Sequence, residues 1–247
     1  MTNPTSESGA APASEDLSVV SRLIGVITSP QATFKAVAAH PSWIGMLLIV
    51  VALSATLVGG FMMTKVGQDA WLDAAINSAA SRGQQMSDQQ IAGMERFVPY
   101  LGYFSIGSMV VFIPLFYLVV SGLLFAVFNA GLGGNASFKQ VFAVVTHTGV
   151  VGVLGQLFTV PMNYMRGAMT SATNLAVLLP FVPENSFAGR LLGTIDLFLI
   201  WQLIVLAIGL GVLYRRRTQP IAFTLFGVYA VIAVIIAVVR GSFGGSN

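Results

Sequence analysis

The chain contains no cysteine and only two histidines, His40 and His147. The absence of cysteine excludes disulfides, thiolate metal sites and lipid-modified thiols. Two histidines without a cysteine or a cluster of carboxylates cannot complete a zinc site, which takes roughly three or four protein ligands. The sequence therefore predicts no metal and no cofactor.

Charged residues are also scarce, at 9% of the chain against roughly 25% in soluble domains. Hydrophobic residues reach 55%, and the mean hydropathy is +0.82. The twelve Lys and Arg outnumber the nine Asp and Glu, which gives a formal net charge of +3, but these basic residues are scattered among segments that flank apolar runs. A nucleic-acid-binding protein gathers such residues on one surface, so the sequence does not indicate a nucleic-acid partner.

Five apolar runs dominate the chain. Each is close to the ~20 residues that a helix needs to cross a ~30 Å hydrocarbon core. Such runs are helical because lipid offers backbone groups no hydrogen-bond partners, whereas a helix satisfies its own. We predict an all-α integral membrane bundle of five transmembrane helices within residues 43–239. Its spans lie at about 43–63, 103–128, 138–160, 191–213 and 220–239, and a short tail follows at 240–247.

The N-terminal region is more polar than the rest of the chain. Residues 1–15 are rich in Ser, Ala, Pro and Glu, which predicts a disordered tail. Farther on, Val20 and Ile24 follow helical spacing, and this predicts an interfacial amphipathic helix within 16–42. A helix packed on the flank of the bundle explains the same spacing equally well.

Two connecting segments have features of their own. Residues 64–102 form the longest polar loop, and Ser87 followed by Gln90 resembles a capping box that opens a helix. We predict a small helical hairpin outside the bilayer, with a plain spacer as the alternative. Residues 175–182 are apolar but too short to cross, so they lie in the interface or re-enter the membrane.

One basic cluster indicates the orientation. Five spans would place six Lys and Arg on each side, so a bare count decides nothing. Arg215, Arg216 and Arg217 form the densest cluster, in a short turn next to span ends, where basic residues carry most weight. We therefore predict a cytoplasmic N-terminus and an external C-terminus. These three arginines are also candidates for binding anionic lipid headgroups.

Polar side chains inside the spans are the candidate functional residues. Asp196 should face the bundle, because a charge facing lipid is costly. The third and fourth spans run antiparallel. Asp196 and Gln156 therefore lie at a similar depth in the membrane, and so do His147 and Gln202, which makes these two pairs candidates for contact. His147 and Gln156 are nine residues apart, on opposite sides of an ideal helix, so both pairs cannot form across one straight contact. Asp196 is either a structural hydrogen-bonding or capping group or a site for a proton or cation.

Small residues predict close helix packing. Gly149, Gly152 and Gly155 recur every three positions in the third span, and Gly209 lies in the fourth. Glycine lets helix backbones approach one another, so we predict helix contacts at these four positions. A dimer seam or a solute path is the alternative.

Three short motifs carry a resemblance to a known family. They are Ser29-Pro30 with Phe34, Gly133-Gly134 with Ser137-Phe138-Lys139, and Asp196-Leu197-Phe198 with Trp201 and Gly209. In this order the motifs resemble the YIP-domain membrane proteins, named for their Ypt/Rab-interacting members. The resemblance implies a five-helix domain with a cytosolic N-terminus and, in eukaryotic relatives, a link to vesicle trafficking and small GTPases. The Asp-Leu-Tyr-Gly-Pro element of those relatives is absent, so the chain is more similar to the bacterial members.

No group of residues predicts an enzyme. The chain has no Cys nucleophile, no Ser-His-Asp set at a shared depth and no paired carboxylates within the spans. We predict a non-enzymatic scaffold of the bacterial inner membrane, whose partners are the lipid bilayer, proteins at the cytoplasmic face or further copies of the chain. The alternative is a small-solute or ion transporter or channel that uses Asp196 and His147. No inverted repeat of the kind common in transporters is evident, which favours the scaffold.

Overall fold

The chain folds into a helical bundle. The computed structural model describes residues 18–179, 181–183 and 186–243, and within these ranges it contains one isolated bridge but no strand. The helices are α1 (Val19–Thr28), α2 (Pro30–Ala39), α3 (Ile44–Ser54), η1 (Ala55–Gly59), α4 (Gly60–Met63), α5 (Lys65–Ala80), α6 (Asp88–Phe97), η2 (Val98–Tyr100), α7 (Leu101–Phe125), η3 (Ala126–Gly131), α8 (Phe138–Arg166), α9 (Leu175–Leu178), α10 (Phe187–Thr194), α11 (Leu197–Leu213) and α12 (Thr218–Phe243).

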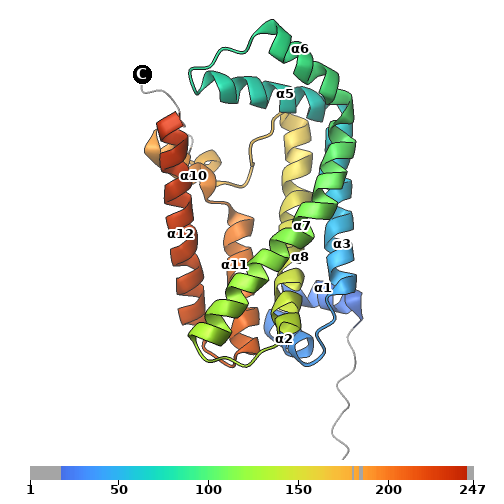
Figure 1. Cartoon of the computed structure of the whole chain (residues 1–247), viewed down its shortest axis with the longest axis vertical. Coiled ribbons are helices and arrows are strands. Elements are labelled where there is room, and N and C mark those ends of the chain that lie inside the picture. The colour runs from blue at the N-terminus through green and yellow to red at the C-terminus, as the bar shows by residue number, and fades with distance from the viewer. Residues whose placement is uncertain (1–17, 180, 184–185, 244–247) are drawn as a thin grey trace, which may run out of the picture.

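Helix α8 is the centre of the bundle. Figure 1 shows α3, α7, α8, α11 and α12 running along the longest axis, with α1 and α2 at one end and α5 and α6 at the other. We call the end with α1, α2 and the turns 132–137 and 214–217 the basic end, and the end with α5, α6 and α10 the hairpin end. In the most apolar stretch of α8, 72% of the residues are buried. The same share is 11% to 33% in the most apolar stretches of the other helices long enough to cross a membrane. Helix α8 packs against α3, α7 and α11, and α11 also packs against α12.

Four helical stretches are long and apolar enough to cross a membrane by length and composition. They are Ile44–Met63, Asp88–Gly131, Phe138–Arg166 and Thr218–Val239. The expected fourth span at 191–213 is instead divided into α10 and α11, and α11 has only 17 residues. Ile195 and Asp196 between them have extended backbone conformations. The prediction of one continuous helix over 191–213 is therefore wrong.

The N-terminal segment forms two helices rather than the single surface helix expected within 16–42. Helix α2 begins at Pro30, because proline suits the first turn of a helix, where its missing N–H costs no hydrogen bond. Phe34 and Val37 of α2 are fully buried, and α2 packs against α8 and α11. This segment therefore matches the alternative of a helix packed on the bundle.

The two predicted tails are only partly within the described residues. The tail expected at 1–15 lies outside them. Helix α12 extends to Phe243, so the first part of the tail expected at 240–247 is helical.

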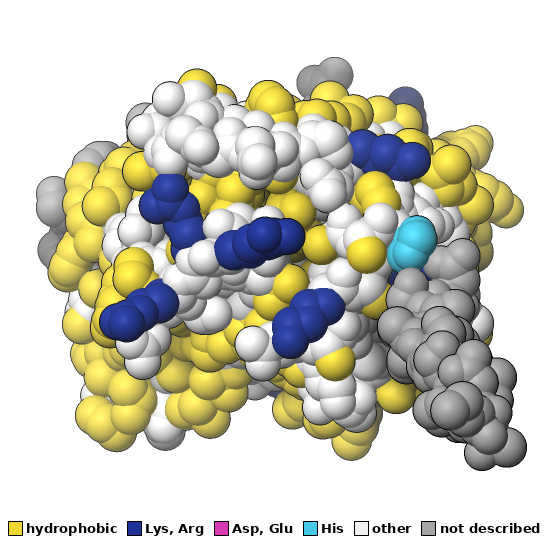
Figure 2. Space-filling model, turned by 90° about the horizontal axis from the view of Figure 1, so that it is seen from below, with side chains coloured by type: hydrophobic (Ala, Val, Ile, Leu, Met, Phe, Trp, Pro, Cys, Tyr) yellow, Lys and Arg dark blue, Asp and Glu magenta, His cyan; other side chains and the backbone are white. Residues whose placement is uncertain are grey.

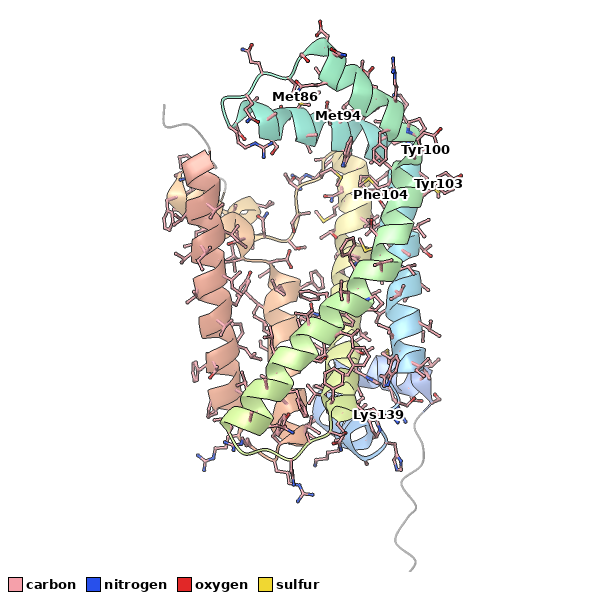
Figure 3. All side chains as sticks on the ribbon, viewed as in Figure 1. Met86, Met94, Tyr100, Tyr103, Phe104 and Lys139 are labelled. Atoms are coloured by element: carbon pink, nitrogen blue, oxygen red, sulfur yellow. The ribbon has the colours of Figure 1, made fainter. Side chains whose placement is uncertain are left out.

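The polar loop expected to form a hairpin contains α5 and α6. The predicted capping box is confirmed, because the Gln90 N–H donates to the Ser87 hydroxyl and the Ser87 N–H donates to the Gln90 side chain at 2.9 Å. Figure 3 shows Met86 and Met94 between the two helices of the hairpin. Helix α6 continues through η2 into α7, so the hairpin is joined to the second long helix without an intervening loop.

Aromatic and basic side chains lie at opposite ends of the apolar surface. Tyr100 and Tyr103, where η2 meets α7, are 62% and 70% exposed, and Figure 3 shows Tyr103 pointing away from the bundle. Tyrosine favours the membrane–water interface. Lys139 lies at the opposite end in the same view. The apolar surface between these residues is the part of the bundle that suits hydrocarbon.

Helix α8 extends beyond its predicted end at 160. Pro161 lies inside the helix, which ends instead at Gly167 with a φ of +58°, the left-handed conformation that closes many helices. Its 29 residues span about 43 Å at 1.5 Å per residue. The last turns of α8 therefore stand beyond a ~30 Å hydrocarbon core.

Candidate functional site

A polar pocket of about 320 Å³ lies between α8, α11 and the segment after Gly167. This volume is at the lower end of the ~300–1,000 Å³ that small-molecule sites occupy. The lining residues are Gly152, Gly155, Gln156, Thr159, Asn163, Met169, Ser171, Thr173, Asp196, Phe198, Leu199 and Gln202. They include one carboxylate and three carboxamides but no Lys, Arg or His. The pocket lining therefore carries a negative charge.

Asp196 lines the pocket and caps the N-terminus of α11. Its Oδ1 atom accepts hydrogen bonds from the backbone N–H groups of Phe198 and Leu199, at 2.9 and 3.2 Å. Its Oδ2 atom accepts from the hydroxyls of Ser171 and Thr173, at 2.8 and 2.6 Å. A helix N-terminus favours negative charge, and hydrogen bonds to a charged acceptor are strong. Asp196 therefore has a structural capping role, one of the two roles that its position in the sequence allows.

Backbone pairing holds the break between α10 and α11. The Leu197 N–H donates to the Thr173 carbonyl oxygen at 3.1 Å, and the Leu175 N–H donates to the Ile195 carbonyl oxygen at 2.9 Å. These bonds replace those that a continuous helix would make, so the extended residues leave fewer polar groups unsatisfied in an apolar setting. The loop thus fixes the point at which α11 begins and where the Asp196 side chain lies.

Two carboxamides in the pocket have an unpaired oxygen. Gln156 Oε1 and Asn163 Oδ1 are buried and have no hydrogen-bond partner among the described residues. An unpaired buried acceptor costs about 1–3 kcal/mol. The two residues are seven positions apart on α8, about two turns, so they lie along the same side of the helix. The pocket therefore presents hydrogen-bond acceptors that the protein itself does not satisfy.

His147 is not part of this pocket. Its side chain is fully buried, and its Nδ1 atom lies 2.7 Å from the carbonyl oxygen of Ala143 on the same helix. Its Nε2 atom has no hydrogen-bond partner among the described residues, so the expected pair with Gln202 does not form.

Asp196 and Gln156 share the pocket, but the hydrogen bonds to Asp196 come from other residues. The expected bond between these two side chains is also absent from the described residues. The physical reason is the break before α11, which places the carboxylate beside the first N–H groups of the helix and the hydroxyls of the loop.

Gly152 and Gly155 lie where α11 passes the pocket. A Cβ atom on Gly155 would lie 3.0 Å from the Phe198 Cβ, and one on Gly152 would lie 3.5 Å from the Gln202 Oε1. Both glycines also line the pocket. The missing side chains therefore let α11 approach α8 and leave space for the cavity.

Gly149 and Gly209 lie in tight contacts away from the pocket. A Cβ atom on Gly149 would overlap the Tyr117 hydroxyl of α7. One on Gly209 would lie 2.6 Å from Val144 Cγ1. The structure thus places these two glycines between neighbouring helices.

The basic end carries the candidate headgroup residues Arg215, Arg216 and Arg217. All three are exposed, as are Lys35 and Lys139 at the same end. Figure 2 shows Lys and Arg side chains spread over this face with no Asp or Glu between them. Helices α1 and α2 and the turns 132–137 and 214–217 contain no acidic residue. We call this surface the basic face.

The hairpin end carries charges of both signs in its described residues. Its basic residues are Lys65, Arg82, Arg96, Arg166, Arg190 and Arg240, and its acidic residues are Asp69, Asp73, Asp88, Glu95 and the pocket residue Asp196. Lys65 and Asp69 form a salt bridge at 3.0 Å. The two ends of the bundle therefore differ in net charge.

Hydrogen bonds hold the turn that presents the arginine run. The Tyr214 hydroxyl donates to Asn129 Oδ1 at 2.8 Å, and Asn129 Nδ2 donates to the Ala136 carbonyl oxygen at 2.7 Å. Arg216 donates to the Leu132 carbonyl oxygen at 2.7 Å. Burial raises the pKa of the Tyr214 hydroxyl above its ordinary value, so it stays protonated and able to donate at neutral pH. The turn is therefore held against the segment between η3 and α8.

Sequence reasoning misses Ser171, Thr173 and Asn163. The two hydroxyls precede Asp196 by 25 and 23 residues, and no periodicity relates a loop to a helix N-terminus over that separation. Asn163 lies beyond the predicted end of the third span. If the third span is taken to continue as a helix through Pro161, Asn163 lies two turns after Gln156, on the same side of the helix. The sequence would then have predicted Asn163 as a neighbour of Gln156.

Comparisons with known proteins identify the family. The family model described as the Yip1 domain matches residues 24–240. The chain is 26% identical over 233 residues to Membrane protein YknW of Bacillus subtilis (strain 168), an alignment that covers 90% of this chain and 92% of that protein. No solved structure gives a significant match. Since the family match covers most of the sequence, the chain belongs to the Yip1 domain family of membrane proteins.

Proposed function

We propose that this protein is a non-enzymatic scaffold of the bacterial cytoplasmic membrane that recruits proteins with acidic surfaces to its basic face. The observation that carries the proposal is the distribution of charge, with exposed Lys and Arg and no acidic residue in the elements of the basic face. Complementary charge speeds the encounter of two proteins and selects between partners. Anionic lipid headgroups at the edge of the same face would hold the bundle in position.

The arginine run supports a cytoplasmic basic face. Arg215, Arg216 and Arg217 lie in a short turn next to span ends, where basic residues carry most weight in favouring the cytoplasmic side. The N-terminus would then lie in the cytoplasm and the C-terminus outside. The similarity to a membrane protein of a bacterium supports the cytoplasmic membrane as the location.

We further propose that α11 is a fifth crossing. Its 17 residues span about 25 Å, slightly less than the ~30 Å of hydrocarbon. Figure 1 shows α11 running lengthwise beside α12, from the basic end towards α10. The capped break at Asp196 would then lie near the edge of the hydrocarbon, where polar groups are least costly.

Single-cysteine variants test this topology directly, because the chain has no other cysteine. Asn135, Gln219, Gln84 and Phe181 are all exposed. In intact spheroplasts, a membrane-impermeant maleimide should modify Gln84→Cys and Phe181→Cys, and it should modify Asn135→Cys and Gln219→Cys only after permeabilisation. Modification of the cysteines at 181 and 219 from the same side would contradict a crossing by α11.

Charge reversal on the basic face tests the scaffold. The double variant Lys35→Glu with Lys139→Glu leaves the arginine run intact as a determinant of orientation. Proximity labelling and crosslinking in native membranes should recover the partner about tenfold less, because like charges placed opposite each other cost several kcal/mol. Point substitutions are preferable to deleting residues 1–38, since Phe34 and Val37 belong to the core.

The matched control makes the same change of charge at the hairpin end. Arg82 and Arg96 are both exposed, and Arg82→Glu with Arg96→Glu should leave the recovered partner unchanged. An equal loss in both double variants would indicate a general effect of net charge. A partner that is recovered equally well with the wild type and the basic-face variant would refute the scaffold as proposed.

The second candidate function is small-solute or ion transport. The pocket that contains Asp196 supports a binding site for a polar solute. His147, the other residue expected on a transport route, lies outside the pocket lining, so the geometry supports binding more than passage. An ion- or pH-dependent flux in reconstituted vesicles that Asp196→Asn abolishes, while the protein still assembles, would favour transport over the scaffold.

A further inference from the structure

We propose that the pocket between α8 and α11 binds the primary ammonium group of an organic cation. The pocket lies towards the opposite end of the bundle from the basic face, so this inference does not depend on the scaffold function. It rests on the charge of the pocket lining, its unpaired acceptors, its size and its depth.

The charge of the lining selects a cation. Asp196 is its one ionisable side chain, and no basic residue lies among the lining residues to balance it. A cleft whose lining carries charge of one sign attracts the opposite charge and repels its own. The ligand group inside the pocket is therefore positive, and a phosphate or carboxylate does not suit the pocket.

The unpaired acceptors select a hydrogen-bond donor. The buried oxygens of Gln156 and Asn163 have no partner among the described residues, and the Gln202 carboxamide also lines the pocket. A primary ammonium group has three N–H donors and no acceptor. It can therefore pair with oxygens that the protein leaves unsatisfied, while Asp196 supplies the opposite charge.

The size and composition of the pocket favour an organic cation over a metal ion. Within the described residues, no group of three or more His, Cys, Asp or Glu could hold a metal. Both Asp196 oxygens already accept two hydrogen bonds each. The pocket volume of about 320 Å³ is about ten times the ~30 Å³ that one molecule occupies in liquid water. The pocket therefore has room for more than a single ion. Met169, Phe198 and Leu199 provide apolar surface for the carbon part of the ligand.

The depth of the pocket makes it accessible from one side of the membrane. Asp196 lies 18 residues from Tyr214 at the basic end, about 27 Å along a helix. With α11 as a crossing, as proposed above, this places Asp196 near the far edge of a ~30 Å hydrocarbon core. Two sources of a primary ammonium group occur at that level, a free amine in the aqueous phase and the headgroup of an aminophospholipid.

Ethanolamine and choline separate hydrogen bonding from charge. The full-length protein is placed in nanodiscs of phosphatidylcholine and phosphatidylglycerol, and ethanolamine and choline are each titrated into it by calorimetry. Ethanolamine should bind saturably, and choline should bind at least about tenfold more weakly, because its quaternary nitrogen has no N–H to donate. Equal binding of ethanolamine and choline, or no binding of ethanolamine, would overturn the proposal.

Two pocket variants and one control locate the site. Asp196→Asn removes the charge but retains a good N-cap, and Gln156→Leu removes one of the unpaired acceptors. Both should weaken ethanolamine binding, Asp196→Asn by about tenfold or more. Asp73→Asn removes an exposed carboxylate from α5 and should not change binding. If all three variants bind ethanolamine like the wild type, the amine binds elsewhere and the proposal fails.

Lipid analysis then identifies the source of the amine. The wild type and Asp196→Asn are purified in parallel from vesicles that contain phosphatidylethanolamine, and the bound lipid is measured by mass spectrometry. Phosphatidylethanolamine enriched on the wild type, reduced in Asp196→Asn and displaced by free ethanolamine would identify a lipid headgroup. Equal lipid on both proteins, together with ethanolamine binding that depends on Asp196, would identify a soluble amine.

Discussion

Replacing Gly209 with valine is expected to lower the free energy of unfolding by about 3 kcal/mol, the upper part of the range for overpacked cores. A Cβ atom at this position would lie 2.6 Å from Val144 Cγ1 and 3.2 Å from the Phe34 ring. Val144 and Phe34 are fully buried. Neither side chain has room to move aside, so α11 would have to separate from α2 and α8.

Gly107→Val is the matched control for this substitution. Gly107 lies in α7, and a Cβ atom there would meet nothing within 4 Å. Its effect on the free energy of unfolding should stay within about 0.5 kcal/mol, as for other substitutions without a tight contact. Unfolding by SDS, followed by tryptophan fluorescence, measures both variants. If Gly209→Val and Gly107→Val lower the free energy of unfolding equally, the close approach of the helices at Gly209 does not contribute to stability.

Asp196→Ala is expected to destabilise the protein by about 2–4 kcal/mol and to loosen the first turn of α11. The substitution removes an N-cap, typically worth about 1 kcal/mol. It also removes the shared acceptor of the Ser171 and Thr173 hydroxyls. Hydrogen bonds to a charged group contribute about 1.5–3 kcal/mol each, and part of this is recovered when the hydroxyls turn to other acceptors. Faster hydrogen exchange at the Phe198 and Leu199 amides would report the loosened turn.

Asp196→Asn separates the capping role from the charge. Asparagine caps helices as well as aspartate does, so this variant should lose less than half of the stability that Asp196→Ala loses. Exchange at Phe198 and Leu199 should stay close to that of the wild type. If exchange at these two amides is unchanged even in Asp196→Ala, the two hydrogen bonds to Oδ1 do not protect the helix start.

Hydropathy and short-range patterns predicted much of the fold. Four of the five apolar runs correspond to helices long enough to cross a membrane. The capping box at Ser87 was also predictable, because it depends on residues three positions apart. The glycines of the third span indicated close packing without identifying the neighbours, which belong to α7 and α11.

The candidate site was only partly predictable. Asp196, Gln156 and Gln202 stand out in the sequence because polar groups are rare in apolar runs, and all three line the pocket. His147 stands out for the same reason but is buried elsewhere. Depth along a helix says nothing about which way a side chain points once the neighbouring helix is broken, so the predicted pairs were wrong.

The sequence by itself determined that this is a helical membrane protein whose densest basic cluster, Arg215 to Arg217, lies in one short turn. It did so because lipid forces each apolar run to satisfy its own backbone, a local requirement that composition reveals. Only the tertiary structure decided that the N-terminal helices join the core, that the fourth apolar run breaks at Asp196, and that the break opens onto a pocket. These features depend on contacts between residues distant in the chain, such as Thr173 with Asp196 and Phe34 with Gly209, and no local pattern encodes such contacts.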